Sequence, residues 1–259
     1  MVEAVLSLTI PLLGTTLGAA LVFLVRDKLP VRLEKLLLGF AGGIMTAAIF
    51  FSLLMPSIES SANLGNLSFL PPVIGFVLGV ALIFLLDKLI PHLHSKINRV
   101  EGRPSHLKKG TLMFLAVTLH NIPEGLTVGV AVAAILQGHE VLTPLAAVAL
   151  AIGIALQNFP EGLIVTLPLK DDGQPKWKAF LFGFLSGAVE PIAALIMLLI
   201  GTLITPILPY CLSFAAGAMF YVVVEEIIPE ASEGGHSDLA VISAGIGFLI
   251  MMLMSLTIG

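Results

Sequence analysis

The sequence is poor in the residues on which soluble and secreted proteins depend. Only 12% of its 259 residues are charged, whereas a soluble domain usually has about 25% charged residues. The single cysteine, Cys211, excludes an intrachain disulfide and leaves the redox compartment open. The 13 basic and 17 acidic residues give a net charge of −4, and nothing suggests a nucleic-acid partner. What remains is apolar: 57% of residues are hydrophobic and the mean hydropathy is +1.04, which indicates an integral membrane protein.

The apolar residues are gathered into long runs separated by short connections. Roughly 20 such residues are needed to cross a bilayer. Eight runs meet this length, at residues 4–25, 36–55, 72–89, 111–136, 142–167, 179–200, 208–228 and 239–258. Only Pro206 and Pro209 divide the sixth run from the seventh. We therefore expect an all-α integral membrane protein, a bundle of eight transmembrane helices with no soluble domain.

The positions of the basic residues predict the orientation of this bundle. All 13 lysines and arginines belong to the first, third and fifth connections. The positive-inside rule places that face in the cytoplasm and both termini outside. The first run is not expected to be a cleavable signal peptide, because the residues before it include Glu3 and no basic residue. The seventh connection is acidic, but acidic residues contribute little to orientation.

A six-residue motif occurs twice, in the middle of the fourth and fifth runs. Residues 120–125 read H-N-I-P-E-G and residues 157–162 read Q-N-F-P-E-G, so four of six positions match. An ionisable side chain at such depth is costly unless something pairs with it. Two carboxylates in the same local sequence point to a common partner, and a divalent cation is the simplest one.

The spacing within the motif gives each glutamate two polar neighbours on one helical face. His120 and Glu124 are four residues apart, and Asn121 and Glu124 are three apart. The second copy repeats this pattern with Gln157, Asn158 and Glu161. Two such faces turned toward each other would form a cage of nitrogen and oxygen ligands, which suits Zn²⁺, Fe²⁺, Mn²⁺ and Cd²⁺.

Proline accompanies each deep carboxylate. Pro123 and Pro160 each remove one helical hydrogen bond, and we expect a kink beside the ligands. Glu190, followed by Pro191, is a third deep carboxylate and a predicted ligand, although a structural pair with His120 is an alternative. Three carboxylates without fixed cations carry too much charge for a dry core, so either they are partly protonated or a metal ion occupies the site. Alternation between these two states would couple proton binding and metal binding.

Weaker candidates surround this group. Met45 and Ser52 lie in the second run, where packing is the default role of such residues. At the predicted cytoplasmic ends of the third and seventh runs, charged and histidine side chains are either simply solvated or form an exit path: Asp87, His92, His94, Glu225, Glu226, Glu230 and His236.

The paired H-N-x-P-E-G and Q-N-x-P-E-G motifs in consecutive runs resemble those of the ZIP (Zrt/Irt-like) divalent metal transporters. The glutamine that opens the second motif is similar to the bacterial GufA-like branch. The resemblance covers essentially the whole chain and implies a single ZIP-type transmembrane domain over residues 1–259. It also implies a 3+2+3 arrangement of the helices with an inverted repeat, homodimers, and alternating access by an elevator-like movement.

The resemblance further implies a binuclear site inside the bundle. One ion would be held by His120, Glu124, Gln157, Glu161 and Met45. The second would be held by Asn121, Glu124, Asn158, Glu161 and Glu190, with Glu124 and Glu161 bridging. Some members have Asp at the position of Asn158, and the neutral amide here predicts a weaker second position. Ser52 would line the outer entrance, and the cytoplasmic release route would be lined by Asp87, His92, Glu225, Glu226 and His236.

We therefore expect a secondary transporter, and not an enzyme, that moves Zn²⁺ into the cytoplasm. Fe²⁺, Mn²⁺ and Cd²⁺ are candidate additional substrates. The expected location is the cell (inner) membrane of a prokaryote, with zinc as transported substrate and no organic cofactor. An intramembrane metalloprotease is disfavoured because H-E-x-x-H is absent and His120 is the one deep histidine. A passive divalent-metal channel would share every ligand and stays open as an alternative.

Overall fold

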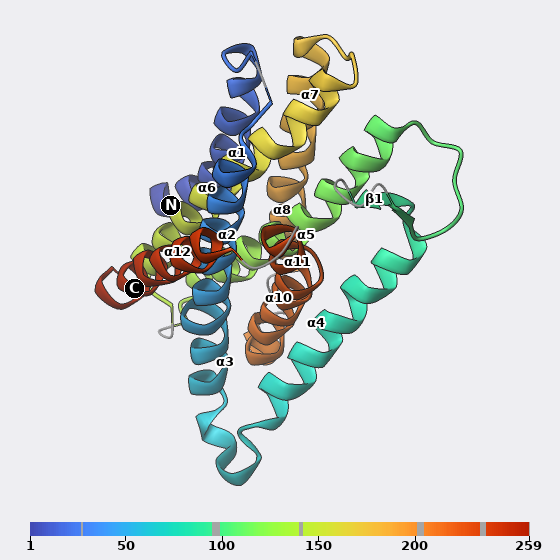
Figure 1. Cartoon of the computed structure of the whole chain (residues 1–259). Coiled ribbons are helices and arrows are strands. Elements are labelled where there is room, and N and C mark those ends of the chain that lie inside the picture. The colour runs from blue at the N-terminus through green and yellow to red at the C-terminus, as the bar shows by residue number, and fades with distance from the viewer. Residues whose placement is uncertain (27, 95–98, 140–141, 201–204, 234–236, 259) are drawn as a thin grey trace.

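The computed structural model describes residues 1–26, 28–94, 99–139, 142–200, 205–233 and 237–258, which are almost entirely helical (Figure 1). Within these residues, eight helical spans are long and apolar enough to cross a membrane. They cover Val2–Phe23, Val31–Ser60, Leu70–Leu89, Gly110–Leu136, Pro144–Asp171, Lys176–Leu199, Leu208–Ser232 and Asp238–Thr257. The prediction of an all-α protein with eight transmembrane helices is confirmed.

The first three spans are assembled from several helical elements. These are α1 (Val2–Ala20), η1 (Leu21–Phe23), α2 (Val31–Ala47), η2 (Ala48–Leu54), α3 (Met55–Ser60), η3 (Ala62–Leu67) and α4 (Leu70–Leu89). The fourth and fifth spans are the long uninterrupted helices α5 (Lys109–Leu136) and α6 (Pro144–Asp171). The remaining elements are α7 (Lys176–Gly187), α8 (Val189–Leu199), η4 (Thr205–Ile207), α10 (Leu208–Val222), η5 (Val223–Ile227), α11 (Ile228–Ser232) and α12 (Asp238–Thr257).

Local sequence signals account for several helix boundaries. Thr143 caps α6 by accepting a hydrogen bond from the backbone N–H of Ala146, and Ser237 caps α12 in the same way. Pro209 lies in the first turn of α10, where its missing N–H costs nothing. The predicted division between the sixth and seventh spans is therefore correct.

One small element departs from the all-helical expectation. Two short antiparallel strands, β1 (His92–His94) and β2 (Arg99–Glu101), form a hairpin in the third connection. The hairpin folds back so that β1 contacts α5, and the Leu93 side chain is buried there (Figure 1). Sequence periodicity could not reveal it, because three residues are too few to show a pattern of alternation.

Lysines of the fifth connection bind the end of the first span. The Lys170 Nζ atom donates to the carbonyl oxygen of Arg26, and Lys176 Nζ donates to that of Phe23, both at 3.0 Å. Cations at a helix C-terminus satisfy its free carbonyls and complement the helix dipole. These two lysines therefore tie the fifth connection to η1 and to Arg26 just after it.

Four helix pairs make the most extensive contacts: α1 with α6, α2 with α12, α4 with α10, and α5 with α8. Glycine allows these helices to approach closely. A Cβ atom at Gly18 would overlap the carbonyl oxygen of Phe159 in α6, and one at Gly125 would overlap the backbone of Glu190 in α8. Small residues have this role at helix interfaces in membranes, where close backbone approach maximises packing. As a result α1, α5, α6 and α8 converge around the two motifs.

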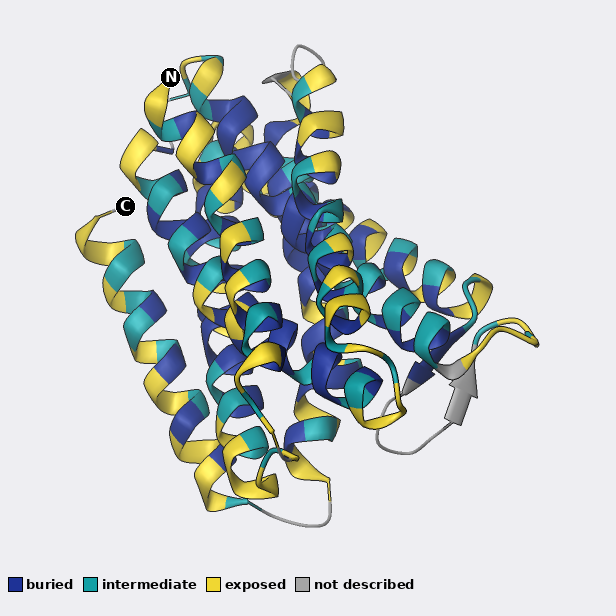
Figure 2. Ribbon diagram, turned by 90° about the horizontal axis from the view of Figure 1, so that it is seen from above, coloured by how far each residue is buried: buried dark blue, intermediate teal, exposed yellow. Residues whose placement is uncertain are grey.

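Burial is concentrated along the interior of the bundle, whereas large apolar side chains cover its outer faces (Figure 2). Two spans contain wide π-helical turns that the sequence did not predict, η2 in the second span and η5 in the seventh. Each directly precedes a helix with a proline in its first turn, Pro56 in α3 and Pro229 in α11. Such turns are rare and often mark functional sites, and η5 carries Glu225 and Glu226.

Candidate metal centre

Six polar side chains from α5, α6 and α8 are buried in the middle of the bundle. All six have exposed fractions of 9% or less: Asn121, Glu124, Gln157, Asn158, Glu161 and Glu190. No lysine or arginine occurs in the sequence between residues 110 and 169, so α5 and α6 carry no fixed cation in the part of each helix that bears the carboxylates. Pro123 and Pro160 lie inside α5 and α6, and both helices continue through them.

The two copies of the motif are joined by a hydrogen bond. The Gln157 amide Nε2 donates to Glu124 Oε1 at 2.7 Å, between α6 and α5. Glu124 Oε2 and Gln157 Oε1 are also buried, and neither has a hydrogen-bond partner among the described residues. The bond therefore fixes one oxygen of the Glu124 carboxylate. It leaves the other Glu124 oxygen and the Gln157 amide oxygen as buried acceptors without a donor among the described residues.

Glu190 is held in a similar way, but by the first span. The Thr15 hydroxyl of α1 donates to Glu190 Oε1 at 2.9 Å, and Glu190 Oε2 has no partner in the described part of the chain. Asn158 lies beside the carboxylates of both Glu190 and Glu124. The structural pair of Glu190 with His120, considered from the sequence, is not formed.

Glu161 lies where the buried group meets a cavity. Its carboxylate is within electrostatic range of Glu124, Glu190, Glu226 and Glu230, and its Oε1 atom has no hydrogen-bond partner among the residues described. The cavity has a volume of about 40 Å³ and is lined by Glu161, His120, Glu226 and Glu230 together with apolar side chains. This is room for an ion or a few water molecules.

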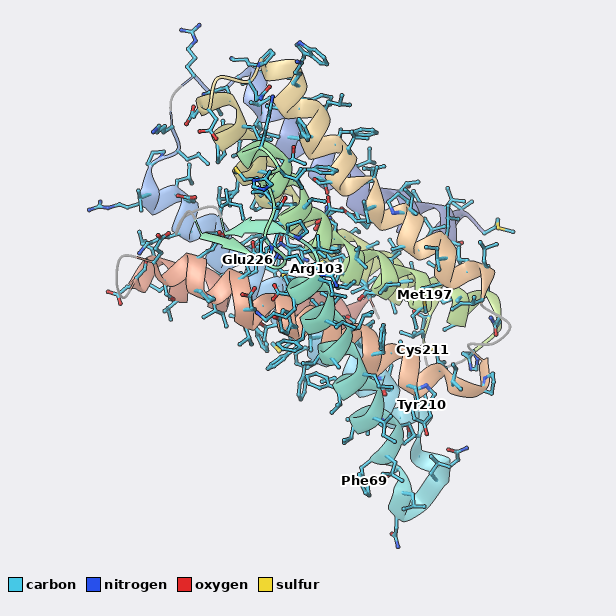
Figure 3. The ribbon with its side chains drawn as sticks, turned by 90° about the vertical axis from the view of Figure 1, so that its right-hand side faces the viewer. Phe69, Arg103, Met197, Tyr210, Cys211 and Glu226 are labelled. Carbon is cyan, nitrogen blue, oxygen red and sulfur yellow. The ribbon has the colours of Figure 1, made fainter. Side chains whose placement is uncertain are left out.

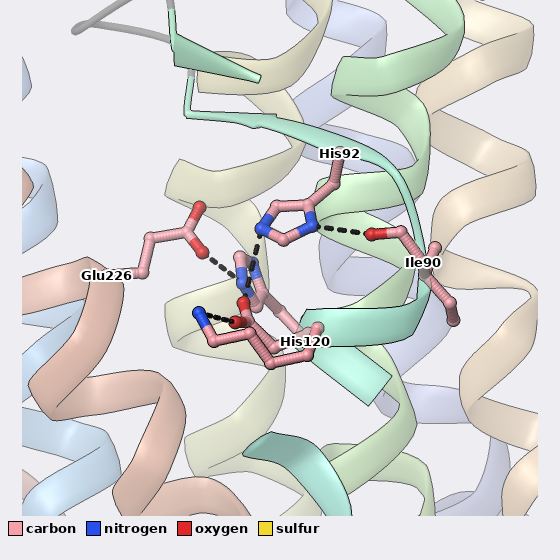
Figure 4. Close-up of polar contacts among 6 residues, drawn as sticks. Ile90, His92, His120 and Glu226 are labelled. Carbon is pink, nitrogen blue, oxygen red and sulfur yellow. Dashed lines mark hydrogen bonds and ion pairs between the residues drawn. The ribbon is translucent and has the colours of Figure 1, made fainter. Parts of the chain in front are cut away.

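His120 lies within electrostatic range of Glu124 and pairs with a residue of the seventh span. Its Nε2 atom pairs with Oε2 of Glu226, which η5 presents to α5 (Figure 4). A ring nitrogen engaged in this way cannot ligate a metal at the same time. His120 must therefore leave Glu226 before its Nε2 can serve as the ligand that the sequence predicts.

The residues predicted to form a release route are brought together on the same side of His120. His92 Nε2 lies 3.2 Å from Asp87 Oδ1, and His92 Nδ1 lies 2.9 Å from the carbonyl oxygen of Ile90 (Figure 4). A second cavity of about 10 Å³ is lined by Asp87, His92, His120 and Glu225. His236, the remaining member of the predicted route, lies outside the described residues.

Met45 and Ser52 belong to the second span. Met45 is fully buried in the apolar core. Ser52 Oγ lies 3.1 Å from Ser255 Oγ in a cavity of about 210 Å³, which Glu59 also lines. In Figure 3, Phe69 lies toward one end of the molecule, Tyr210 lies between Phe69 and the centre, and Glu226 lies near the middle.

Among the described residues, no three His, Cys, Asp or Glu side chains are arranged to hold a metal ion together. The donor atoms of the centre are instead carboxylate and amide oxygens from α5, α6 and α8, and the Nε2 atom of His120 is paired with Glu226.

Sequence reasoning missed Thr15. Its position between Gly14 and Gly18 offered a signal, because small residues so spaced allow a helix to approach a neighbour closely. The partner of the hydroxyl, however, is 175 residues away in the sequence.

These features define a class of protein. A multi-pass helical bundle that directs buried carboxylate and amide oxygens into its centre is a protein that handles cations within the membrane. Comparison with known proteins gives the family, since the family model described as "ZIP Zinc transporter" matches residues 105–255. The chain belongs to the ZIP family, and the resemblance to its GufA-like branch is confirmed.

Three relatives illustrate this similarity. Zinc transporter GufA of Myxococcus xanthus is 35% identical over 96% of each chain. Zinc transporter ZIP11 of Homo sapiens is 35% identical over 95% of this chain and 94% of its own length. Zinc transporter ZIPB of Bordetella bronchiseptica is 33% identical over 95% of this chain and 78% of its own.

Proposed function

We propose that this protein is a secondary transporter that moves Zn²⁺ across the membrane into the cytoplasm through the buried polar centre. One observation carries the proposal: five buried oxygen atoms of this centre have no hydrogen-bond partner among the described residues. They are Glu124 Oε2, Gln157 Oε1, Asn158 Oδ1, Glu161 Oε1 and Glu190 Oε2. An unsatisfied buried acceptor costs about 1–3 kcal/mol, and more if charged. Divalent cations bound at the centre would supply partners for these oxygens, and relatives that match 95% and 96% of this chain are named zinc transporters.

Two adjacent ion positions would share this centre. The first uses His120, Glu124, Gln157, Glu161 and Met45, and the second uses Asn121, Glu124, Asn158, Glu161 and Glu190. The unpartnered oxygens of Glu124 and Glu161 support their bridging role. The neutral Asn158 amide makes the second position the weaker one, since a carboxylate would add charge.

The ion would enter past Ser52 and leave between the third and seventh spans. The cavity at Ser52 and Glu59 supports an outer entrance. The cavities around His120 support an inner exit lined by Asp87, His92, Glu225 and Glu226, with His236 beyond. The named groups on this route are oxygen and nitrogen ligands and not thiolates, which suits an ion that must bind and then leave.

The helix contacts support a 3+2+3 arrangement with an inverted repeat. In such a repeat, spans one, two and three correspond to spans six, seven and eight, and span four corresponds to span five. Under this correspondence the α1–α6 pair becomes the α8–α5 pair, and the α2–α12 pair becomes the α10–α4 pair. All four are the extensive pairs of this bundle. The same exchange relates η2 to η5, the two π-helical turns. We propose that the protein is a single domain of residues 1–259 in a prokaryotic inner membrane, with both termini outside. It would form homodimers and work by elevator-like alternating access.

Reconstituted protein tests this function directly. Liposomes that contain the wild type and a trapped zinc indicator should take up external Zn²⁺, and the Glu124→Ala/Glu161→Ala double variant should not. Size-exclusion profiles of both proteins control for folding. Uptake by the double variant equal to that of the wild type would contradict the proposed centre.

The same liposomes separate a carrier from a channel. A carrier that alternates between two states gives uptake that saturates with zinc concentration, whereas flux through an open pore continues to rise. We expect saturation and proton movement against the zinc flux. Linear, non-saturating flux would assign the protein to the channel alternative, and Fe²⁺, Mn²⁺ and Cd²⁺ added as competitors would rank the ions it accepts.

A further inference from the structure

The first span contributes a side chain to the polar centre that neither the motifs nor the family resemblance assigns. Thr15 of α1 is 1% exposed, and its hydroxyl donates to Glu190 Oε1 at 2.9 Å. The carbonyl oxygen of Pro11, the usual acceptor for a helical threonine, is 3.5 Å from the same hydroxyl. Because a hydroxyl has one proton, the shorter bond to Glu190 takes it.

Packing leaves the Thr15 side chain little freedom. A Cβ atom at Gly187 of α7 would contact the Cβ, Cγ2 and Oγ1 atoms of Thr15, so α7 lies directly against this side chain. On the other side, a Cβ atom at Gly162 of α6 would overlap the carbonyl oxygen of Thr15. Thr15 is therefore fixed between two helices, and its hydroxyl is a donor of fixed position.

This bond divides the two oxygens of Glu190. Oε1 is occupied by the Thr15 hydroxyl, whereas Oε2 is buried and has no partner in the described residues. Glu124 shows the same division, with Oε1 held by Gln157 and Oε2 without a partner. Glu124 and Glu190 thus each offer one oxygen without a hydrogen bond to an ion in the centre.

The number of carboxylate oxygens available to a bound ion affects which ion size the centre prefers. Zn²⁺ is small and usually takes four ligands, which single carboxylate oxygens supply well. Larger cations accept more oxygen ligands and readily take both oxygens of one carboxylate. A centre in which Glu124 and Glu190 each have one oxygen held by a protein donor therefore favours Zn²⁺ over the larger Cd²⁺.

We propose that Thr15 is a specificity-determining residue, which holds Glu190 to a single free oxygen and so favours zinc over larger divalent ions. The inference rests on the proposed function. It makes Thr15 a positioning residue that acts through Glu190 and does not itself touch the ion.

The test compares zinc and cadmium uptake by proteoliposomes that contain the wild type, Thr15→Val or Thr15→Ser. The measured quantity is the ratio of Vmax/KM for Zn²⁺ to that for Cd²⁺. Thr15→Val keeps the shape but removes the donor, and should lower the ratio about tenfold, as expected for one hydrogen bond to a charged group. Thr15→Ser keeps the hydroxyl and should retain the wild-type ratio. Thr15→Ala carries the same expectation as Thr15→Val if the latter does not fold.

Two further variants separate positioning from a general packing defect. Thr16 lies beside Thr15 in α1, but its hydroxyl donates to the carbonyl of Leu12 at 2.6 Å, so Thr16→Val should leave the ratio unchanged. In a Glu190→Ala background, Thr15→Val should not change the ratio further, because the group it positions is gone. An unchanged ratio in Thr15→Val, or an equal change with and without Glu190, would overturn the inference. Absence of zinc uptake by the wild type would instead refute the proposed function.

Discussion

Replacing Glu226 by glutamine tests how His120 is controlled. In the structure, His120 Nε2 pairs with Glu226 Oε2, and the two side chains are only 14% and 11% exposed. If His120 is a zinc ligand, Glu226 competes with zinc for it. Glu226→Gln keeps the size of the side chain but removes its charge, and should therefore raise the affinity for zinc.

The expected magnitude follows from the strength of that pair. A hydrogen bond to a charged group contributes about 1.5–3 kcal/mol, and about 1.4 kcal/mol corresponds to a tenfold change in a binding constant. Since glutamine still offers a weaker neutral acceptor, we expect the zinc Kd to fall about tenfold. Release should slow as well, because Glu226 no longer draws His120 from the ion. Uptake should accordingly show a lower KM together with a lower Vmax.

The assay combines zinc titration against a chromophoric chelator in detergent with uptake by proteoliposomes. Glu233→Gln is the matched control, because it removes an exposed carboxylate that lies beyond the cavity. Adding His120→Ala should abolish the gain in affinity. A higher Kd in Glu226→Gln would refute the reasoning, since it would make Glu226 a zinc ligand and not a competitor.

Two other predictions concern packing and the second ion position. Gly18→Ala should lower Tm by about 2–10 °C, because its Cβ would overlap the backbone of Phe159 and overpacking costs about 1–3 kcal/mol. Gly245→Ala has open space around it and should not lower Tm in the same melting experiment; equal effects of the two substitutions would contradict the packing described. Asn158→Asp adds a carboxylate beside Glu124 and Glu190 and should raise the zinc content measured after gel filtration toward two ions per chain. An unchanged zinc content would argue against a second position at Asn158.

The sequence predicts the parts of this protein that depend on local patterns. A run of apolar residues long enough to span a bilayer must become a helix, because only a helix satisfies its own backbone there. Helical periodicity likewise places Asn121 and Glu124 on one face, and both are buried side by side in α5. Pro206 and Pro209 correctly separate the sixth and seventh spans.

Contacts between distant segments could not be predicted in this way. The bond from Thr15 to Glu190 and the pair of His120 with Glu226 depend on which helix faces which. The π-helical turn η5, which presents Glu226, has no simple sequence signature. The motif therefore predicts which atoms can bind an ion. The fold decides which of these atoms accept hydrogen bonds from protein donors and which remain available to an ion.

The position of bound zinc tests the central claim most directly. Crystals of zinc-loaded protein, measured on both sides of the zinc absorption edge, would locate the ion from its anomalous signal. We expect the strongest peak among α5, α6 and α8, within bonding distance of Glu124 Oε2 and Glu161 Oε1. Zinc peaks confined to histidines outside the bundle, with none at these two oxygens, would contradict the account.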